Sequence, residues 1–268
     1  MLEVLSHPFM QRAVLAGVAC ALACSILSVY IVLKRMAFIG EGIAHSAFGG
    51  VALAILMGWN ITITTMVFAV VVAILIGVTA RDRRISEDSA IGIFLTTSMA
   101  LGVVFLNIHR QFTADIFGYL FGNILAVDVS NLIAVAILAV VVIALVAVFY
   151  KELLFFTFDE EMAKASGMPT NLIYFLLLFL VSLTVVVSIK MVGLILVSAL
   201  LIIPGAAALL VTRSLRWMII VAVILGVGAA IGGLVGSYYL RLGSGAVMVL
   251  CLFAAFVVLR LVRALRRG

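Results

Sequence analysis

Residues 36–80 read MAFIGEGIAHSAFGGVALAILMGWNITITTMVFAVVVAILIGVTA, and Glu41 is the one charged residue among them. A membrane-spanning helix needs about 20 consecutive, mostly apolar residues. The stretch is therefore long enough for two passes across a bilayer, which we predict at roughly 42–57 and 61–80. It indicates an integral membrane protein built from helices.

The rest of the chain has the same character. Of its 268 residues, 67% are hydrophobic and 10% are charged, and the mean hydropathy is +1.43. Soluble domains are nearer a quarter charged. The apolar runs are continuous rather than alternating, which disfavours a β-barrel. We therefore predict an all-α polytopic membrane protein, a single domain over residues 1–268, with about eight or nine transmembrane helices. The other spans are predicted at roughly 12–33, 89–106, 131–150, 171–189, 192–211, 217–236 and 244–262.

Basic residues predict the orientation, because lysine and arginine concentrate in cytoplasmic loops. If the N-terminus is outside and the C-terminus is cytoplasmic, the basic clusters share the cytoplasmic side, with Arg110, Lys190 and Arg241 as isolated exceptions. These clusters are Lys34 and Arg35, the arginines of 81–84, Lys151, Arg213 and Arg216, and the arginines of 260–267. The orientation predicts an odd number of crossings.

Residues 107–130 do not follow the pattern of the spans. The segment 115–123 is aromatic, contains glycine and is too short to cross a membrane. It can form a re-entrant or interfacial helix at the outer mouth, or a loop that Phe117, Tyr119 and Phe121 anchor at the interface. Both interpretations remain open.

Glu41 and His45 form the candidate functional pair. Their spacing places the carboxylate and the imidazole on one face of a helix. Ionisable groups are costly in hydrocarbon and usually face a water-filled path or an ion, and a carboxylate with an imidazole suits a divalent transition metal. The alternative is a histidine that is hydrogen-bonded for packing. His45 lies about 18 Å from Met57, at 1.5 Å per residue, so the site is deep in the membrane.

A second candidate site is a short helix on the cytoplasmic side, predicted at about 158–166. Thr157 followed by Glu160 is typical of a capping box, and acidic residues suit the start of a helix. Gly167 is a natural stop, and Pro169 prevents continuation. The helix either docks onto a soluble partner or lies in the lipid headgroup region.

Small residues and one proline predict details of the packing. Gly228, Gly232 and Gly236 are spaced like Ala13, Gly17 and Ala21, and such spacing lets helices approach closely in lipid. We expect contacts within the chain, with a dimer seam as the alternative. Pro204 lies inside a predicted span and should kink that pore helix.

Three stretches together resemble a known family. They are Arg35–Ser46 (RMAFIGEGIAHS), Phe158–Gly167 (FDEEMAKASG) and Val192–Pro204 (VGLILVSALLIIP). In order along nearly the whole chain, they are similar to the permease subunits of the ABC-3 family, bacterial ABC importers for zinc, manganese or iron.

The resemblance implies a homodimer in the bacterial plasma membrane. It also implies two cytoplasmic ATPase subunits and an extracytoplasmic protein that delivers the metal. No permanently bound cofactor is expected, since the zinc, manganese or iron ion is the cargo. The family motif places metal contacts at Glu41, where many members have aspartate, and at His45. It makes the helix at 158–166 the ATPase-coupling helix, with Phe158, Asp159, Glu160, Glu161, Met162, Ala163 and Gly167 as coupling residues.

The metal pair has a physical consequence for assembly. Two ligands are too few for a closed zinc site, whereas two pairs related by a two-fold axis supply four. Transport requires an ion that binds and leaves, and hence moderate affinity.

Several motifs of competing functions are missing from the sequence. A G-x-x-x-x-G-K-[ST] phosphate loop is absent, so the energy must come from a partner or an ion gradient. HExxH is absent too, and we expect a transport subunit rather than an enzyme. The alternative function is a stand-alone secondary metal carrier, a class that commonly shows inverted repeats and several intramembrane charges.

Overall fold

The computed structural model describes residues 8–82, 84–109, 124 and 127–265, and the elements within them are helical. Nine of the helices in this part of the chain are long and apolar enough to cross a membrane. The predicted all-α membrane fold is therefore confirmed. These helices are α2 (Pro8–Leu33), α3 (Ile39–Met57), α4 (Ile61–Ala80), α5 (Glu87–His109), α7 (Val129–Val148), α10 (Thr170–Val192), α11 (Leu194–Val211), α12 (Leu215–Leu240) and α13 (Ser244–Leu265).

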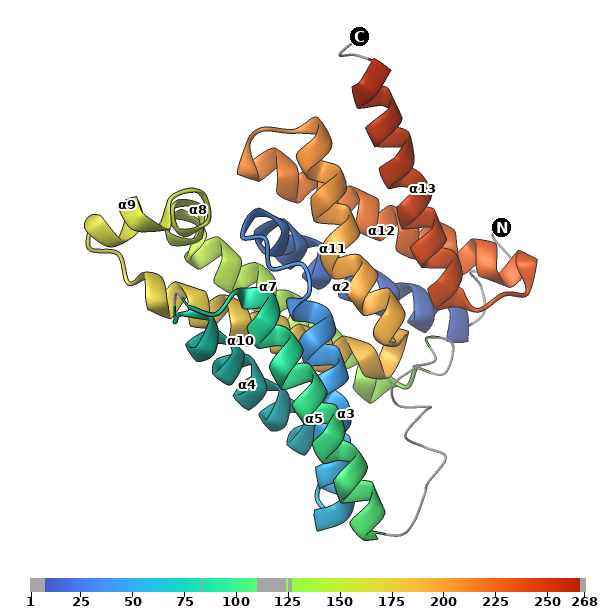
Figure 1. Cartoon of the computed structure of the whole chain (residues 1–268). Helices are drawn as coiled ribbons and strands as arrows, with labels where there is room; N and C mark the ends of the chain where they lie inside the picture. Colours follow the sequence, from blue (N-terminus) through green and yellow to red (C-terminus); the bar gives the residue numbers. More distant parts are fainter. Residues whose placement is uncertain (1–7, 83, 110–123, 125–126, 266–268) are drawn as a thin grey trace.

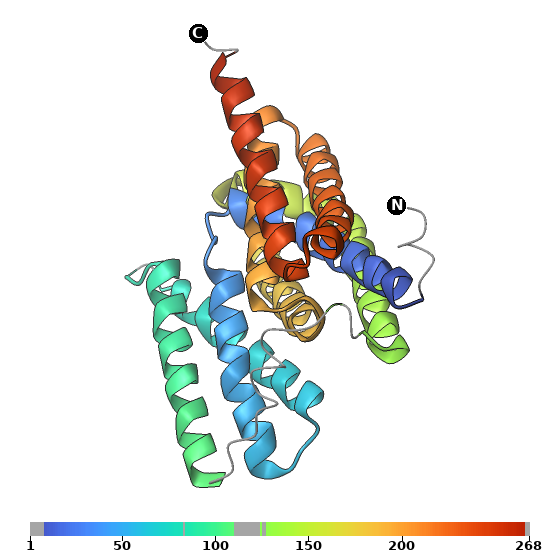
Figure 2. The same ribbon diagram turned by 90° about the vertical axis from the view of Figure 1, so that its right-hand side faces the viewer.

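The long helices form two groups that share α10 as a bridge (Figures 1 and 2). Helices α3, α4 and α5 pack side by side in one group. Helices α2, α11, α12 and α13 form the other, and α7 lies against α2. Helix α10 contacts both α4 and α2. Helix α10 therefore joins the two groups, and α3 also contacts α11 directly.

Glycines let helices of each group approach closely. A Cβ added at Gly49 of α3 would lie 2.7 Å from the Ser98 carbonyl oxygen of α5. A Cβ added at Gly50 would lie 2.9 Å from the Thr65 Cα of α4. Because these neighbours are backbone atoms, no side-chain rotation can make room. Helix α3 is consequently held tightly between α4 and α5.

The GxxxG expectation holds for α2 but only in part for α12, where Gly236 packs against Val247 of α13. Gly17 of α2 packs inside the chain, with Ile124, Leu234 and Ala230 around it. On α12, Gly228 and Gly232 face open space, with no atom within 4 Å of an added Cβ. The prediction of intramolecular contacts at those two glycines was therefore wrong. The contacts of α12 with α2 and α13 use Gly226 and Gly233 on another face instead.

We expect Gly205→Ala to destabilise the protein, because the new Cβ would lie 2.5 Å from the Ser28 carbonyl oxygen of α2. Overpacking of this kind costs about 1–3 kcal/mol. Gly228→Ala is the matched control, since it adds the same methyl group to open space. Thermal unfolding of the purified protein in detergent should show a lower midpoint for Gly205→Ala alone. Equal midpoints for the two variants would contradict the close α2–α11 packing.

Pro204 lies buried within α11, which continues from Leu194 to Val211. The kink at Pro204 remains a prediction. His7, Arg110 and the segment 110–123, including Asp115, lie outside the described residues, as does the side chain of His109. The two interpretations of the segment 115–123 therefore both stand.

The short helix between α7 and α10 differs from its prediction. The structure has two helices here, α8 (Tyr150–Phe158) and α9 (Glu160–Ala165), which meet at Asp159. The extended backbone of Asp159 and its carboxylate, which accepts from the Met162 N–H at 2.8 Å, begin α9. Thr157 was predicted as the cap. Its hydroxyl instead donates to the Leu153 carbonyl at 2.6 Å, because Thr157 still lies within α8.

The predicted end of this helix agrees with the structure. Gly167 has a φ of +78°, its N–H donates to the Lys164 carbonyl, and the Met168 N–H donates to the Ala163 carbonyl. These bonds form a Schellman motif, which glycine favours because it adopts positive φ without a Cβ penalty.

Candidate functional site

Glu41 and His45 lie in the first two turns of α3, and both side chains are half-buried. The helix begins at Ile39, three residues before the predicted span, so Glu41 belongs to it. His45 Nδ1 lies 3.0 Å from the Glu41 carbonyl oxygen. A carbonyl only accepts hydrogen bonds, so this contact requires the proton on Nδ1. In the neutral imidazole this tautomer leaves the lone pair on Nε2, the atom through which a metal could bind.

Gly40, next to Glu41, shows where the start of α3 packs. A Cβ added at Gly40 would lie 2.7 Å from Leu201 Cδ1. Leu201 is near the middle of α11, which runs from Leu194 to Val211. The start of α3 thus packs against the middle of another helix that is long and apolar enough to cross a membrane.

Within the described part of the chain, Glu41 and His45 belong to no larger cluster of metal-ligating side chains. Among the described residues, no group of three or more histidine, cysteine, aspartate or glutamate side chains is close enough to hold a metal ion. Glu41 and His45 offer one oxygen-bearing and one nitrogen-bearing side chain, which are types of ligand that suit a transition metal. Two such ligands are too few for a closed site.

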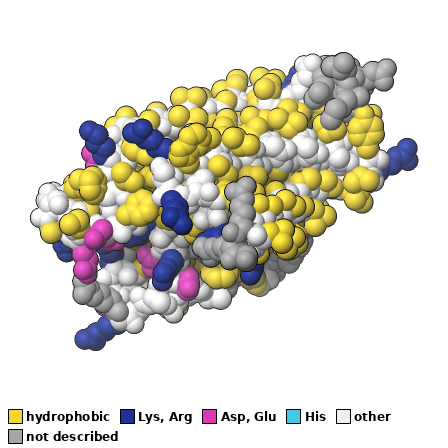
Figure 3. All heavy atoms as spheres, turned by 90° about the horizontal axis from the view of Figure 1, so that it is seen from above, with side chains coloured by type: hydrophobic (Ala, Val, Ile, Leu, Met, Phe, Trp, Pro, Cys, Tyr) yellow, Lys and Arg dark blue, Asp and Glu magenta, His cyan; other side chains and the backbone are white. Residues whose placement is uncertain are grey.

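The second candidate site is the α8–α9 surface, formed by Phe155, Phe158 and Met162. These side chains are 47%, 58% and 63% exposed. The neighbouring Asp159 and Glu161 are exposed as well, while Ala163 is buried against the bundle. Figure 1 shows α8 and α9 at the edge of the bundle. Seen from above, the acidic side chains gather at this end of the molecule, and apolar ones cover most of the remaining face (Figure 3).

Glu160 lies on the same helix but points toward the bundle. Its Oε2 accepts from Lys34 Nζ at 2.6 Å, and its Oε1 accepts from the Arg81 guanidinium at 2.5 Å. Partial burial raises the pKa of this carboxyl, but the Lys34 hydrogen bond and the two positive charges outweigh burial, so that the pKa falls below its ordinary value. Glu160 is therefore ionised at neutral pH. Sequence reasoning grouped it with the exposed Asp159 and Glu161, since nothing local reveals partners so far away.

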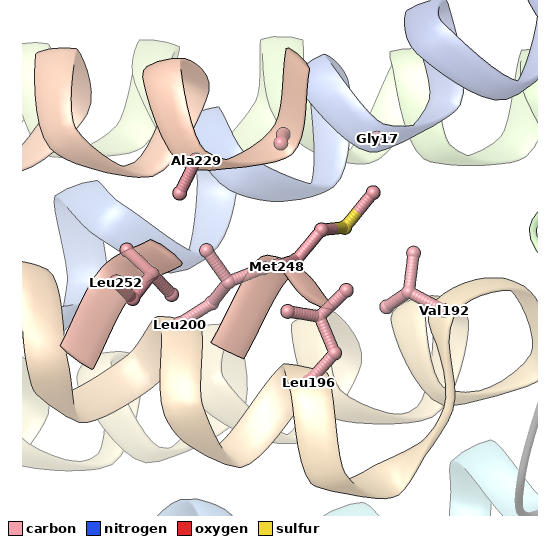
Figure 4. Close-up of a pocket in the computed structure, with 8 residues that line it drawn as sticks. Gly17, Val192, Leu196, Leu200, Ala229, Met248 and Leu252 are labelled. Carbon is pink, nitrogen blue, oxygen red and sulfur yellow. The ribbon is translucent and has the colours of Figure 1, made fainter. Parts of the chain in front are cut away.

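An enclosed apolar region between α2, α11, α12 and α13 carries no comparable chemistry. Figure 4 shows Leu196 and Leu200 of α11 beside Met248 and Leu252 of α13. Its lining contains only apolar side chains and glycine. We assign it to core packing.

A multi-pass helical bundle with a carboxylate–imidazole pair in one of its candidate spans, and an exposed helical surface at one end, fits a membrane transport protein. The model of the ABC 3 transport family matches residues 6–263. This chain belongs to that family.

The manganese transport system membrane protein MntC of Halalkalibacterium halodurans is 37% identical over 248 residues, which are 92% of this chain and 85% of that protein. The manganese import system permease protein ScaB of Streptococcus gordonii is 34% identical over 250 residues, or 93% and 90% of the two chains. Among solved structures, a chain of PsaBC from Streptococcus pneumoniae in complex with Fab is 32% identical. It has a TM-score of 0.84, and the match covers 96% of this chain and 93% of that one.

Proposed function

We propose that this chain is the permease subunit of an ABC importer that carries a divalent transition metal into the bacterial cell. Membership of the ABC 3 transport family carries the proposal. Manganese is the first candidate because MntC and ScaB are named for it. Zinc and iron are the competitors, since ligand type alone does not separate these ions.

The metal path runs past Glu41 and His45. In the membrane, a carboxylate and an imidazole with a free Nε2 replace part of the water shell of a divalent ion. Two copies of the chain, related by a two-fold axis, bring two such pairs together and complete four ligands. The half-buried position of both side chains on one protomer leaves them accessible to a second copy.

The α8–α9 surface is the docking site of a cytoplasmic ATPase, one for each permease. Helices that lie in the headgroup region of a membrane are rich in lysine and arginine. Here the exposed side chains at the start of the helix include Asp159 and Glu161, and carboxylates are repelled by anionic lipid headgroups. The exposed Phe158 and Met162 provide the apolar centre that a protein interface requires.

This assignment places the α8–α9 end of the bundle in the cytoplasm. The N-terminus is then outside and the C-terminus is cytoplasmic, in agreement with the distribution of lysine and arginine. An extracytoplasmic binding protein delivers the ion to the opposite end. Hydrolysis of ATP belongs to the partner subunit, because this sequence has no phosphate-binding loop of the Walker type.

We expect metal accumulation in cells that express this chain to require the ATPase. Uptake of manganese, zinc and iron should be measured by mass spectrometry, with the permease alone, with an ATPase partner, and with an ATPase whose hydrolysis is disabled. Accumulation of one metal only with the active ATPase supports the importer. Equal accumulation without the ATPase would identify a secondary carrier instead.

A further inference from the structure

Glu160 ties the short helix α9 to the ends of two spanning helices. Lys34 directly follows the last residue of α2, and Arg81 directly follows α4. Both bind the Glu160 carboxylate, at 2.6 Å and 2.5 Å. The side chains of Lys34, Arg81 and Glu160 are 15%, 32% and 29% exposed. Such shielded, charge-assisted hydrogen bonds hold their geometry better than surface ion pairs do.

Aromatic rings support both cations. Lys34 Nζ lies 4.0 Å from the centre of the Phe156 ring of α8, and the Arg81 guanidinium lies 4.4 Å from that of Tyr174 of α10. The Tyr174 hydroxyl donates to Glu87, the first residue of α5, at 3.4 Å. Cation–π contacts of this kind are attractive and directional. We call the group of Glu160, Lys34, Arg81, Phe156, Tyr174 and Glu87 the Glu160 joint.

The lysine side of the joint leads directly to the metal pair. Lys34 begins the connection between α2 and α3, and Glu41 lies seven residues further along the chain. This connection is compact, because Arg35 has a φ of +60° and the Met36 N–H donates to the Ile31 carbonyl at 2.9 Å. Met36 itself is 1% exposed. A displacement of Lys34 therefore moves the start of α3 rather than being absorbed by a loose loop.

The arginine side reaches the same helix by packing. Helix α4, which Arg81 directly follows, contacts α3 closely at Gly50 and Thr65. Helix α5, linked through Glu87, contacts α3 at Gly49 and Ser98. Close-packed backbones move together, since there is no space to absorb a shift. Both partners of Glu160 thus lead to α3.

We propose that Glu160 is a positioning residue that transmits displacement of α9 to α3, and so to Glu41 and His45. This inference rests on the proposed function, in which the ATPase moves α9. It assigns different tasks to neighbouring residues of one short helix: the exposed Phe158 and Met162 bind the ATPase, whereas Glu160 faces inward and passes the movement on. Loss of the joint should leave an ATPase that binds and hydrolyses ATP without moving metal.

The test is Glu160→Gln in the permease–ATPase complex, reconstituted in liposomes with manganese, and with zinc or iron if uptake in cells selects one of those. The amide keeps the shape of the side chain but removes the charge that holds Lys34 and Arg81. We expect unchanged association and ATPase activity, with metal transported per ATP falling about tenfold, a typical size for coupling between sites. Asp88→Asn, an exposed carboxylate one residue from Glu87, is the matched control and should transport normally.

A second variant tests whether the lysine and the glutamate act as one unit. If they do, the double variant Lys34→Gln with Glu160→Gln should transport as much metal per ATP as the more impaired of the two single variants. Multiplied losses would overturn the inference, and so would an unchanged metal-to-ATP ratio in Glu160→Gln. Loss of ATPase binding in Glu160→Gln would also overturn it, by placing Glu160 in the docking surface. A different result tests the docking assignment. If the ATPase still binds when Phe158 and Met162 are replaced, the α8–α9 surface is not its docking site, whatever the result for Glu160→Gln.

Discussion

Replacement of His45 by alanine is expected to abolish metal uptake. The variant removes the free Nε2 that we assign to the ion, while the alanine methyl fits the space of the larger ring. Replacement of a group that only supports a metal ligand already lowers metal affinity or activity by about 10–100-fold. Loss of the ligand itself should therefore lower uptake by roughly 100-fold or more. Uptake should be measured in cells at equal amounts of membrane-inserted permease, together with its ATPase.

Glu41→Gln tests the other half of the pair with a nearly isosteric change. The amide keeps one oxygen but loses the negative charge that offsets a divalent ion in the membrane, so we expect a similar loss of uptake. His7→Ala is the control for removal of a histidine elsewhere in the chain. Normal uptake in both His45→Ala and Glu41→Gln would refute the assigned metal path and leave His45 as a packing residue.

Phe158→Asp together with Met162→Asp should detach the ATPase. Both side chains are more than half exposed on the α8–α9 surface, so the substitution does not disturb the core. Burial of two carboxylates in an apolar interface is unfavourable, and loss of hot-spot residues typically costs 2 kcal/mol or more. We expect association with an affinity-tagged ATPase to weaken by about 30-fold or more, since 1.4 kcal/mol is tenfold in affinity.

Lys164→Ala is the matched control for the docking surface. Lys164 is exposed on α9, and its position two residues after Met162 turns it to another side of the helix. Its replacement should leave the ATPase bound. Retention of the ATPase by the double aspartate variant would reject the α8–α9 surface as the docking site.

The two candidate sites, the Glu41–His45 pair and the α8–α9 surface, could be predicted from the sequence to different degrees. Glu41 and His45 could be found because they are four residues apart in a stretch with no other charge, and one helix turn relates them directly. The hydrogen bond from His45 Nδ1 to the Glu41 carbonyl also follows from this local spacing, because the two residues are one helical turn apart. The further ligands that the proposed metal site needs could not be found in the same way, because no other candidate lies nearby in the sequence.

The α8–α9 region shows where local reasoning misleads. The pattern of Thr157 and Glu160 is typical of a capping box, but α8 extends through Thr157, and Asp159 begins the next helix. Tertiary contacts explain the difference. Phe156 is buried beneath Lys34, and Glu160 pairs with two cations, and the two helices meet at Asp159, between these two contacts. A capping residue depends on such packing as much as on its own side chain.

The glycines of α12 are a second case. Gly228, Gly232 and Gly236 have the spacing of a packing motif, but such spacing does not identify the partner helix. In the structure, the first two face open space, while Gly236, Gly226 and Gly233 make contacts within the chain. Only the rotation of α12 about its own axis distinguishes these faces.

The amino-acid sequence by itself determined the all-helical membrane fold and the Glu41–His45 pair, because hydropathy and the helical repeat are properties of neighbouring residues. Tertiary structure alone decided which way Glu160 faces. Its partners Lys34 and Arg81 are 126 and 79 residues away along the chain. Both belong to basic clusters that membrane orientation alone explains, so nothing in the sequence marks them as ion-pair partners. An ion pair over such a distance depends on the packing of α2, α4 and α10, since only that packing brings the three charges within a few ångströms.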